Sequence, residues 1–180
     1  MPVWCAYLIL YICVFLFGIV IGSFLNVCIY RYPKNESLLK GSHCMECGYH
    51  LRWYDLIPLF SFLILRGRCR KCHAKLSLLY PLVEGMNGAL YVIVFLANGF
   101  NVMSVIYCLL TSALIVLSII DFRQYIIPDK VNIMILVLGI IATIVDQSQW
   151  KDHVIGFFLV SVILLIIYLV TVGRGIGGGD

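Results

Sequence analysis

The sequence predicts an all-α polytopic membrane protein with about five transmembrane helices and a zinc-binding cytoplasmic insert. Hydrophobic residues make up 62% of the 180 residues and charged residues only 12%, whereas soluble domains usually hold about 25% charged residues. Five apolar runs recur along the chain at lengths close to that of a spanning helix. Nine of the 13 lysines and arginines lie between Arg31 and Lys75, which is typical of a cytoplasmic loop beside a membrane. A nucleic-acid-binding patch is the weaker explanation of this cluster, so we expect no nucleic-acid partner.

The first expected helix covers residues 3–30, which contain no charged side chain. A span needs about 20 residues, so this run is long enough for a tilted helix with interfacial ends. A cleaved signal peptide fits poorly, because no basic residue precedes the apolar region and that region is too long. Arg31 and Lys34 follow the run, which predicts an N-terminus outside the cytoplasm. Gly18 and Gly22 either let a second helix approach closely or are simply two glycines in a helix.

Residues 31–79 form a polar insert that contains one apolar stretch, 56–65. Ten residues are too few to cross a bilayer, so we expect this stretch to pack under the insert or to lie at the interface. Four further apolar runs follow, at 80–98, 102–121, 131–146 and 154–172. If the basic loops are cytoplasmic, Asp121 lies at the cytoplasmic end of the third span and the chain returns to that face before Asp180. No internal repeat is visible.

Four of the eight cysteines lie in the insert, as Cys44-x2-Cys47 and Cys69-x2-Cys72 with 21 residues between the pairs. Two such pairs can hold one zinc ion in a tetrahedral four-cysteine site. A reducing cytoplasm disfavours structural disulfides, and unpaired thiols or a redox pair are the weaker alternatives. Four sulfurs leave no open position for a catalytic water, so we expect the zinc to be structural.

Three histidines lie beside these cysteines, namely His43, His50 and His73. We expect them to be solvated loop residues, because the cysteines already complete the coordination shell.

Asp121 ends an uncharged apolar run, a costly place for a carboxylate. Its expected partner is Asp180, which ends the glycine-rich segment GRGIGGGD. Two carboxylates that share one proton can hydrolyse a peptide bond, because the ionised one activates water and the protonated one polarises the carbonyl. The glycines would let the backbone approach an extended substrate or let a helix break. A phosphate-binding loop is the weaker explanation, because no lysine follows at the required spacing.

Asp129 competes with Asp121 for the catalytic role. It follows Pro128 at the start of the next apolar run, where an acidic residue suits a helix N-terminus. This favours a capping role for Asp129 and leaves catalysis open. The structural alternative for Asp121 is an interfacial charge at a helix end.

Four motifs, in this order, resemble those of the bacterial type IV prepilin peptidases, also called leader peptidases. They are GSFLNVCIYRYP at 22–33, the tetracysteine stretch from CMECGYHLRW to YPLVE at 44–84, DFRQYIIPDK at 121–130 and GGGD at 177–180. The resemblance runs nearly the whole length of the chain.

The resemblance implies a GxGD-type aspartic endopeptidase of the bacterial cytoplasmic (inner) membrane, with Asp121 and Asp180 as the catalytic pair. It would remove the basic leader from type IV prepilins or pilin-like pseudopilins at the cytoplasmic face. Many members also methylate the new N-terminus with S-adenosylmethionine, a function associated with the cysteine-containing region, and the motifs assign no residue to that step.

The resemblance also implies an organisation into a first spanning helix (1–30), a tetracysteine zinc-binding domain (31–79) and a peptidase domain (80–180). Members normally continue past the GGGD aspartate with further helices, so we expect this chain to be truncated at its C-terminus. The alternative function is that of an inactive truncated homologue or a non-catalytic membrane scaffold for pilus or secretion assembly. The sequence predicts no oligomeric state.

Overall fold

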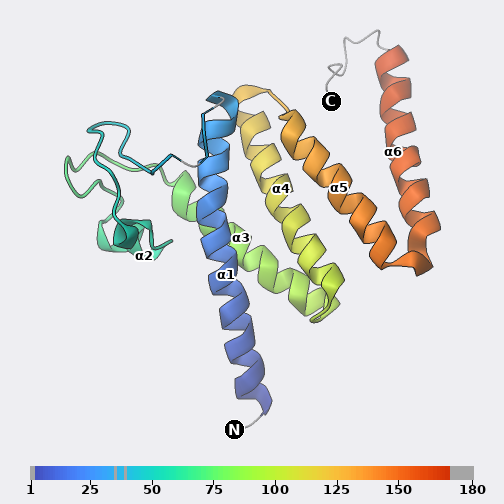
Figure 1. The fold of residues 1–180 in the computed structure, drawn as a ribbon, viewed down its shortest axis with the longest axis horizontal. Helices are drawn as coiled ribbons and strands as arrows, with labels where there is room; N and C mark the ends of the chain where they lie inside the picture. The colour runs from blue at the N-terminus through green and yellow to red at the C-terminus, as the bar shows by residue number, and fades with distance from the viewer. Residues whose placement is uncertain (1–2, 35, 39, 171–180) are drawn as a thin grey trace.

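The computed structural model describes residues 3–34, 36–38 and 40–170, and this part of the chain is helical without a β-strand (Figure 1). Two single-turn 3-10 helices lie at Tyr32–Lys34 and Gln147–Gln149, and a third short one lies in the insert at Trp53–Leu56. The α-helices are α1 (Val3–Arg31), α2 (Phe60–Ile64), α3 (Leu79–Asn98), α4 (Val102–Gln124), α5 (Asp129–Val145) and α6 (Trp150–Val170).

The five predicted apolar runs form the five long helices, which confirms the all-α polytopic fold class. Four of them, α1, α3, α4 and α6, are long and apolar enough to cross a membrane. Helix α5 has 17 residues, about 26 Å at 1.5 Å per residue, which is at the lower limit for a span.

Close contact between α1 and α3 explains the glycine pair of the first helix. A Cβ atom added at Gly18 would lie 2.7 Å from Gly88 Cα, and one at Gly22 would lie 2.7 Å from Glu84 Cα. Both distances are shorter than real Cβ contacts, so only glycine lets the two backbones approach this closely. Of the two interpretations of this pair, the structure confirms the one in which a second helix packs against it.

A polar network joins α1, α3 and α4 inside the bundle. Asn87 is fully buried, and its Nδ2 donates to the Gly18 carbonyl at 2.7 Å. Its Oδ1 accepts from the Ser112 hydroxyl at 2.9 Å, and Ser112 is 2.9 Å from the Tyr91 hydroxyl. Buried polar groups in a membrane need such partners, so this network fixes the register of the three helices.

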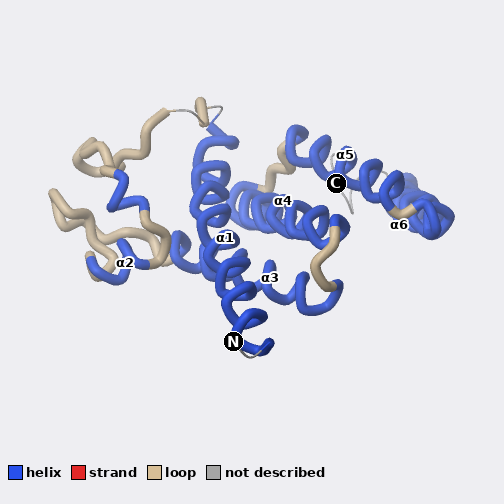
Figure 2. Tube along the Cα trace, turned by 60° about the horizontal axis from the view of Figure 1, so that its bottom comes forward, coloured by secondary structure: helices blue, strands red, loops and turns tan. Residues whose placement is uncertain are grey.

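The main apolar core lies where α1, α3, α4 and α5 converge. Its buried members are Leu25, Cys28, Ile29, Val83, Ala113, Ile115, Val116, Ile120 and Val131. Ile120 immediately precedes Asp121, so the predicted catalytic aspartate follows directly on the best-packed part of the bundle. Helix α6 stands apart from this core on the far side of α5, as Figures 1 and 2 show.

Candidate metal centre and aspartate site

Each cysteine pair of the insert lies in a tight turn of the same geometry. In each turn the N–H of the first cysteine, Cys44 or Cys69, donates to the carbonyl five residues later at 2.9 Å. The carbonyl of that cysteine accepts the N–H four residues later at 3.0 Å. The residue after the second cysteine, Gly48 or His73, has a positive φ of 66° or 55°. This left-handed residue turns the chain back after the second sulfur.

The two turns form an internal repeat, which corrects the expectation that the chain has none. Residues 43–50 and 68–75 each close with an isolated antiparallel bridge, between His43 and His50 and between Arg68 and Lys75. The aligned segments HCMECGYHL and RCRKCHAKL share only two cysteines and a final leucine. The signal in the sequence was the equal spacing from each cysteine pair to that leucine. Three shared residues in a segment of this length are too few to be recognised as a repeat.

The four cysteine sulfurs converge on one point. They all lie within 4.8 Å of one another. The Sγ atoms of Cys44 and Cys72 are 3.8 Å apart, and those of Cys47 and Cys69 are 3.9 Å apart. A tetrahedral zinc ion with Zn–S distances near 2.3 Å separates its sulfurs by about 3.8 Å. The geometry therefore suits a metal ion bound by all four cysteines.

Four sulfurs this close cannot all be anionic without a compensating cation. The backbone N–H groups of Cys72 and Lys71 point at the Cys69 sulfur and lower the pKa of that thiol to about 6. The N–H of Ala74 lowers the pKa of Cys72 in the same way, but desolvation and the three neighbouring thiols outweigh it and raise that pKa to about 12. A divalent metal ion would remove this conflict, because it stabilises thiolates directly.

The three neighbouring histidines remain outside the sulfur cluster, as predicted. A ring nitrogen of His43 lies 3.4 Å from the Gly41 carbonyl oxygen, and His50 and His73 are exposed. Among the described residues, the group that could hold a metal contains cysteines alone.

Asp55 joins the second turn to the segment that follows the first. Its side chain is 1% exposed, and its Oδ1 accepts from Arg70 Nε at 2.7 Å. Its Oδ2 accepts from the Arg52 N–H at 3.3 Å and from the Tyr49 hydroxyl at 3.5 Å. The Arg70 guanidinium also lies over the Tyr54 ring, 5.0 Å from its centroid. Asp55 thus holds the two halves of the insert together beside the cysteines.

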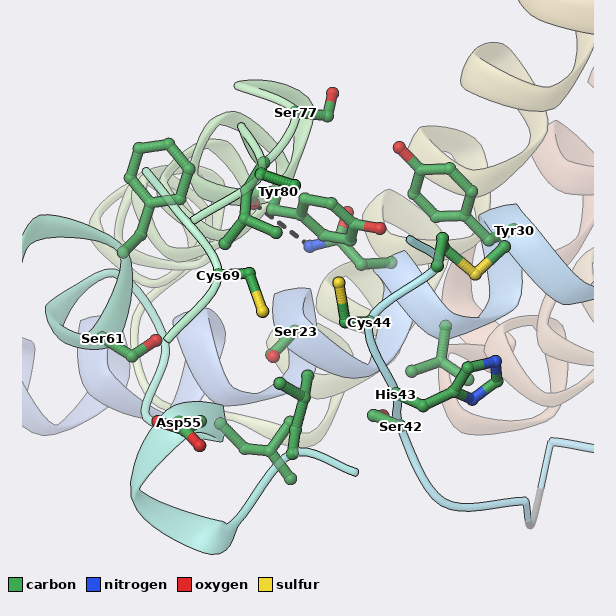
Figure 3. Close-up of a pocket in the computed structure, with 18 of the residues that line it drawn as sticks. Ser23, Tyr30, Ser42, His43, Cys44, Asp55, Ser61, Cys69, Ser77 and Tyr80 are labelled. Atoms are coloured by element: carbon green, nitrogen blue, oxygen red, sulfur yellow. Dashed lines mark hydrogen bonds between the residues drawn. The ribbon is translucent and has the colours of Figure 1, made fainter. Parts of the chain in front are cut away.

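A cavity of about 390 Å³ lies between the insert and the adjacent ends of α1 and α3 (Figure 3). Cys44 and Cys69 line it from the insert, and Tyr30 and Tyr80 line it from the helices. Asn26 Nδ2 donates to the Tyr80 carbonyl at 3.1 Å, while Asn26 Oδ1 is buried without a hydrogen-bond partner among the described residues. The cavity is within the size range of small-molecule sites and offers a buried acceptor.

Glu84 fixes the insert to α3 at the edge of this cavity. This buried carboxylate accepts the Leu59 N–H through Oε2 at 2.8 Å. Leu59 has a positive φ of 59°, which is rare for a bulky residue, and the bond to Glu84 holds it there. The insert is therefore positioned by a buried carboxyl group inside a spanning helix.

Asp121 lies in the last turn of α4 and is exposed. Its carbonyl accepts the N–H of Tyr125 at 2.7 Å, and Tyr125 takes a left-handed conformation that ends the helix. Within the described residues its carboxylate has no hydrogen bond or ion pair. Nearby, the Arg123 guanidinium lies 5.2 Å from the Tyr30 ring centroid and joins the ends of α4 and α1.

Of the other two candidate aspartates, the structure describes Asp129 but not Asp180. Asp129 is the first residue of α5 and is exposed, next to the N-cap Pro128. It is placed to stabilise the helix N-terminus through its charge. Asp180 lies outside the described residues, so its pairing with Asp121 stays a prediction. In Figure 1 the C-terminal ends of α4 and α6 lie on the same side of the bundle.

Sequence reasoning gave no individual role to Asp55, Glu84 or Asn26. For Glu84 a signal existed, because a carboxylate inside the run 80–98 is costly unless it has a partner. Asn26 lies in an otherwise apolar helix and carries the same kind of signal. Asp55 offered none, since an acidic residue in a polar loop is ordinary.

Comparison with known proteins matches the two parts of the chain to two adjoining domains. The Bacterial Peptidase A24 N-terminal domain matches residues 16–98, and the Type IV leader peptidase family matches residues 108–180. No solved structure matches.

Curated relatives align over nearly the whole chain. A prepilin leader peptidase/N-methyltransferase of Myxococcus xanthus is 34% identical over 92% of this chain and 51% of its own length. The type 4 prepilin-like proteins leader peptide-processing enzyme of Escherichia coli is 34% identical, over 91% of this chain and 70% of its own length. A prepilin leader peptidase/N-methyltransferase of Pseudomonas aeruginosa is 32% identical, over 94% and 68%. The chain thus spans about half to about two thirds of these relatives, and it belongs to the type IV prepilin leader peptidase family.

Proposed function

We propose that this protein is a membrane aspartic endopeptidase that cleaves the leader peptide of type IV prepilins or pilin-like pseudopilins. The observation that carries this proposal is the similarity to prepilin leader peptidases, which extends over 91 to 94% of the chain in the relatives described above. In this proposal Asp121 and Asp180 form the catalytic pair, one ionised to activate water and one protonated to polarise the scissile carbonyl.

The resemblance of residues 121–130 to the first aspartate motif of the family favours Asp121 over Asp129, which is likewise exposed. The surroundings of Asp121 are compatible with a catalytic role. Its carboxylate is exposed and unpaired within the described residues, at the end of a helix whose preceding turns are packed in the core. A catalytic carboxylate needs a rigid backbone that holds it in place and an oxygen atom that is free to contact the substrate or water. Asp129 has an ordinary role at the start of α5.

We also propose the topology that places this chemistry at the cytoplasmic face of a bacterial inner membrane. The N-terminus would lie outside, and the basic residues from Arg31 to Lys75 would lie in the cytoplasm with Asp121. The divisions at 30/31 and 79/80 then separate the first span, the insert and the peptidase helices.

For the insert we propose one structural zinc ion held by Cys44, Cys47, Cys69 and Cys72. The sulfur separations of 3.8 and 3.9 Å support zinc, because they equal those of a tetrahedral site. With four protein ligands the ion would stabilise the insert and take no part in peptide hydrolysis.

A second activity, N-methylation of the new N-terminus with S-adenosylmethionine, is favoured by the cavity between the insert and the helices. Asn26 Oδ1 and the Glu84 carboxylate supply acceptors there for the ammonium group of such a donor. When bound, the donor would supply an electrophilic methyl group for an amine.

The test reconstitutes the chain in lipid vesicles with a synthetic pilin-like peptide that carries a basic leader, and follows the products by mass spectrometry. We expect cleavage by the wild type and a loss of about 10²- to 10⁴-fold for Asp121→Asn, the usual contribution of a general acid or base. Asp129→Asn is the matched control and should cleave normally. Methylation appears as a separate mass increase of the cleaved product.

Normal processing by Asp121→Asn would remove this residue from the catalytic pair. If the wild-type chain inserts and folds but cleaves nothing, an inactive homologue or a non-catalytic scaffold becomes the better description of this chain.

A further inference from the structure

The apolar stretch 56–65 of the insert has two faces with different surroundings. Ser61, Phe62 and Leu65 line the cavity beside the cysteines. Phe62 also packs under Gly67, where an added Cβ would lie 2.9 Å from the end of its ring. This inner face belongs to the insert.

The outer face is apolar and has no protein partner among the described residues. Leu63 is 71% exposed and Ile64 is 76% exposed, and the neighbouring Ile57 and Phe60 are exposed as well. A contiguous apolar face of this kind on a polar domain marks an interaction site.

The position of this face along α1 identifies what covers it. Leu59, at the centre of the stretch, is bonded to Glu84, and the Glu84 backbone is in contact with Gly22. Gly22 lies nine residues before Arg31, which ends α1, or about 14 Å along the helix axis. Figure 1 shows α2 beside the length of α1, near the start of α3, rather than beyond the end of α1.

The membrane thickness then limits the depth of the stretch. The uncharged part of α1, residues 3–30, is about 42 Å long, about 12 Å more than a typical hydrocarbon core of about 30 Å. Even if all this excess lay at the Arg31 end, Gly22 would lie about at the edge of the core. Tilt of α1 would move it deeper.

Charges at both ends of the stretch fit the same location. Arg52 precedes it, Arg66 and Arg68 follow it, and all three are exposed. Basic residues beside an apolar face favour the headgroups of anionic lipids.

We propose that residues 56–65 form an interfacial membrane anchor, in which the outer face of α2 enters the bilayer interface beside α1 and α3. The partner is lipid, with anionic headgroups around the flanking arginines. The anchor would hold the cysteine insert against the membrane, so that the cavity opens at the level of the interface. This inference requires only that α1 and α3 cross the membrane, and it is independent of the proposed peptidase activity.

The experiment places one tryptophan on this face. Trp4, Trp53 and Trp150 are changed to phenylalanine, and Leu63→Trp is added in the full chain. The protein is reconstituted in vesicles of equal parts phosphatidylglycerol and phosphatidylcholine, with bromine on the upper part of the acyl chains. The comparator is Met45→Trp in the same background. Met45 is 66% exposed and lies four residues after Gly41, whose carbonyl accepts from the guanidinium of Arg31 at the end of α1 at 3.3 Å.

We expect the brominated lipid to quench the tryptophan at 63 several-fold more strongly than the one at 45, and iodide in the water to show the opposite order. Ile64→Trp should repeat the result of Leu63→Trp. Equal iodide quenching at the two positions would overturn the anchor. Protection of position 63 from both quenchers would also overturn it, because the face would then be covered by protein, either a second copy or another chain.

Discussion

At the residue scale, the insert depends on a few charged side chains that each hold one connection. Arg31 donates from its guanidinium to the carbonyls of the loop that follows α1, among them those of Ser37, Leu38 and Gly41. Glu84 accepts the Leu59 N–H, and Asp55 accepts from Arg70. None of the three touches the sulfur cluster directly, yet together they determine where the four cysteines can lie.

Replacement of Asp55 by asparagine should loosen the metal site. The neutral amide would lose the ionic component of the bond to Arg70 and leave a poorly paired group in a buried place. We expect a cost of about 1.5 kcal/mol, the lower end for a hydrogen bond to a charged group, because the Arg70 side chain is 43% exposed. Metal release to a coloured chelator should then be about tenfold faster.

Glu46→Gln is the control for this variant. Glu46 is an exposed acidic residue of the same insert and has no hydrogen bond in the described structure. If both variants release metal at the wild-type rate, Asp55 has no part in holding the two cysteine turns together.

At the element scale, the sequence located helices far better than contacts. Hydropathy predicted all five long helices, because a single long apolar segment in a membrane satisfies its own backbone hydrogen bonds only as a helix. It did not decide whether Gly18 and Gly22 are a packing site, because that depends on Gly88 and Glu84, more than 60 positions away. The repeat of the two cysteine turns could not be predicted either, although its residues are close in the sequence. The two turns share their backbone hydrogen bonds but few of their side chains.

In the candidate site, too, local features could be predicted from the sequence and contacts between distant segments could not. The convergence of the four cysteines could be predicted from their spacing, because each short turn leaves its two sulfur atoms little freedom. The cavity beside it could not be predicted, because it is formed by α1, α3 and the insert together. The edge of an apolar run predicted that Asp121 lies at a helix end, and the structure places it in the last turn of α4. Its proposed pairing with Asp180 stays a prediction, because Asp180 lies outside the described part of the chain.

Gly22→Ala tests the contact between α1 and α3. The added methyl group would lie 2.7 Å from Glu84 Cα and 3.2 Å from the Val83 carbonyl oxygen, both of them backbone atoms that cannot rotate away. Overpacking of this kind costs about 1–3 kcal/mol. We expect a lower melting temperature in detergent, measured by the loss of helical circular dichroism.

The control for this variant is Gly139→Ala in α5, where an added Cβ meets no atom within 4 Å. That change should leave the stability equal or slightly higher, because alanine favours helix more than glycine does. A melting temperature for Gly22→Ala equal to that of the control would show that α1 and α3 do not need this close approach.

At the scale of the whole molecule, the insert and the helix bundle are two structures held together by different forces. The bundle is stabilised by its apolar core and by the Asn87 network. No residue of the insert is among the buried members of the core near Asp121, and only Tyr32, Leu38 and Leu79, at the two ends of the insert, pack against it partly buried. The insert depends instead on the four cysteines, the Asp55–Arg70 pair and the bond from Leu59 to Glu84. Loss of the metal should therefore disorder the insert and spare the bundle.

Metal removal tests this division. Freshly purified protein should contain about one zinc ion per chain, because the four cysteines form a single site. A strong chelator, or the substitution Cys44→Ser, should release it and make the remaining insert thiols reactive. The helical circular dichroism should change little, whereas limited proteolysis should now cut within residues 40–78. Cys108→Ser, which changes a buried cysteine of α4 outside the cluster, should keep the zinc. If chelation instead melts the bundle, the insert is part of its stability and the two structures fold as one.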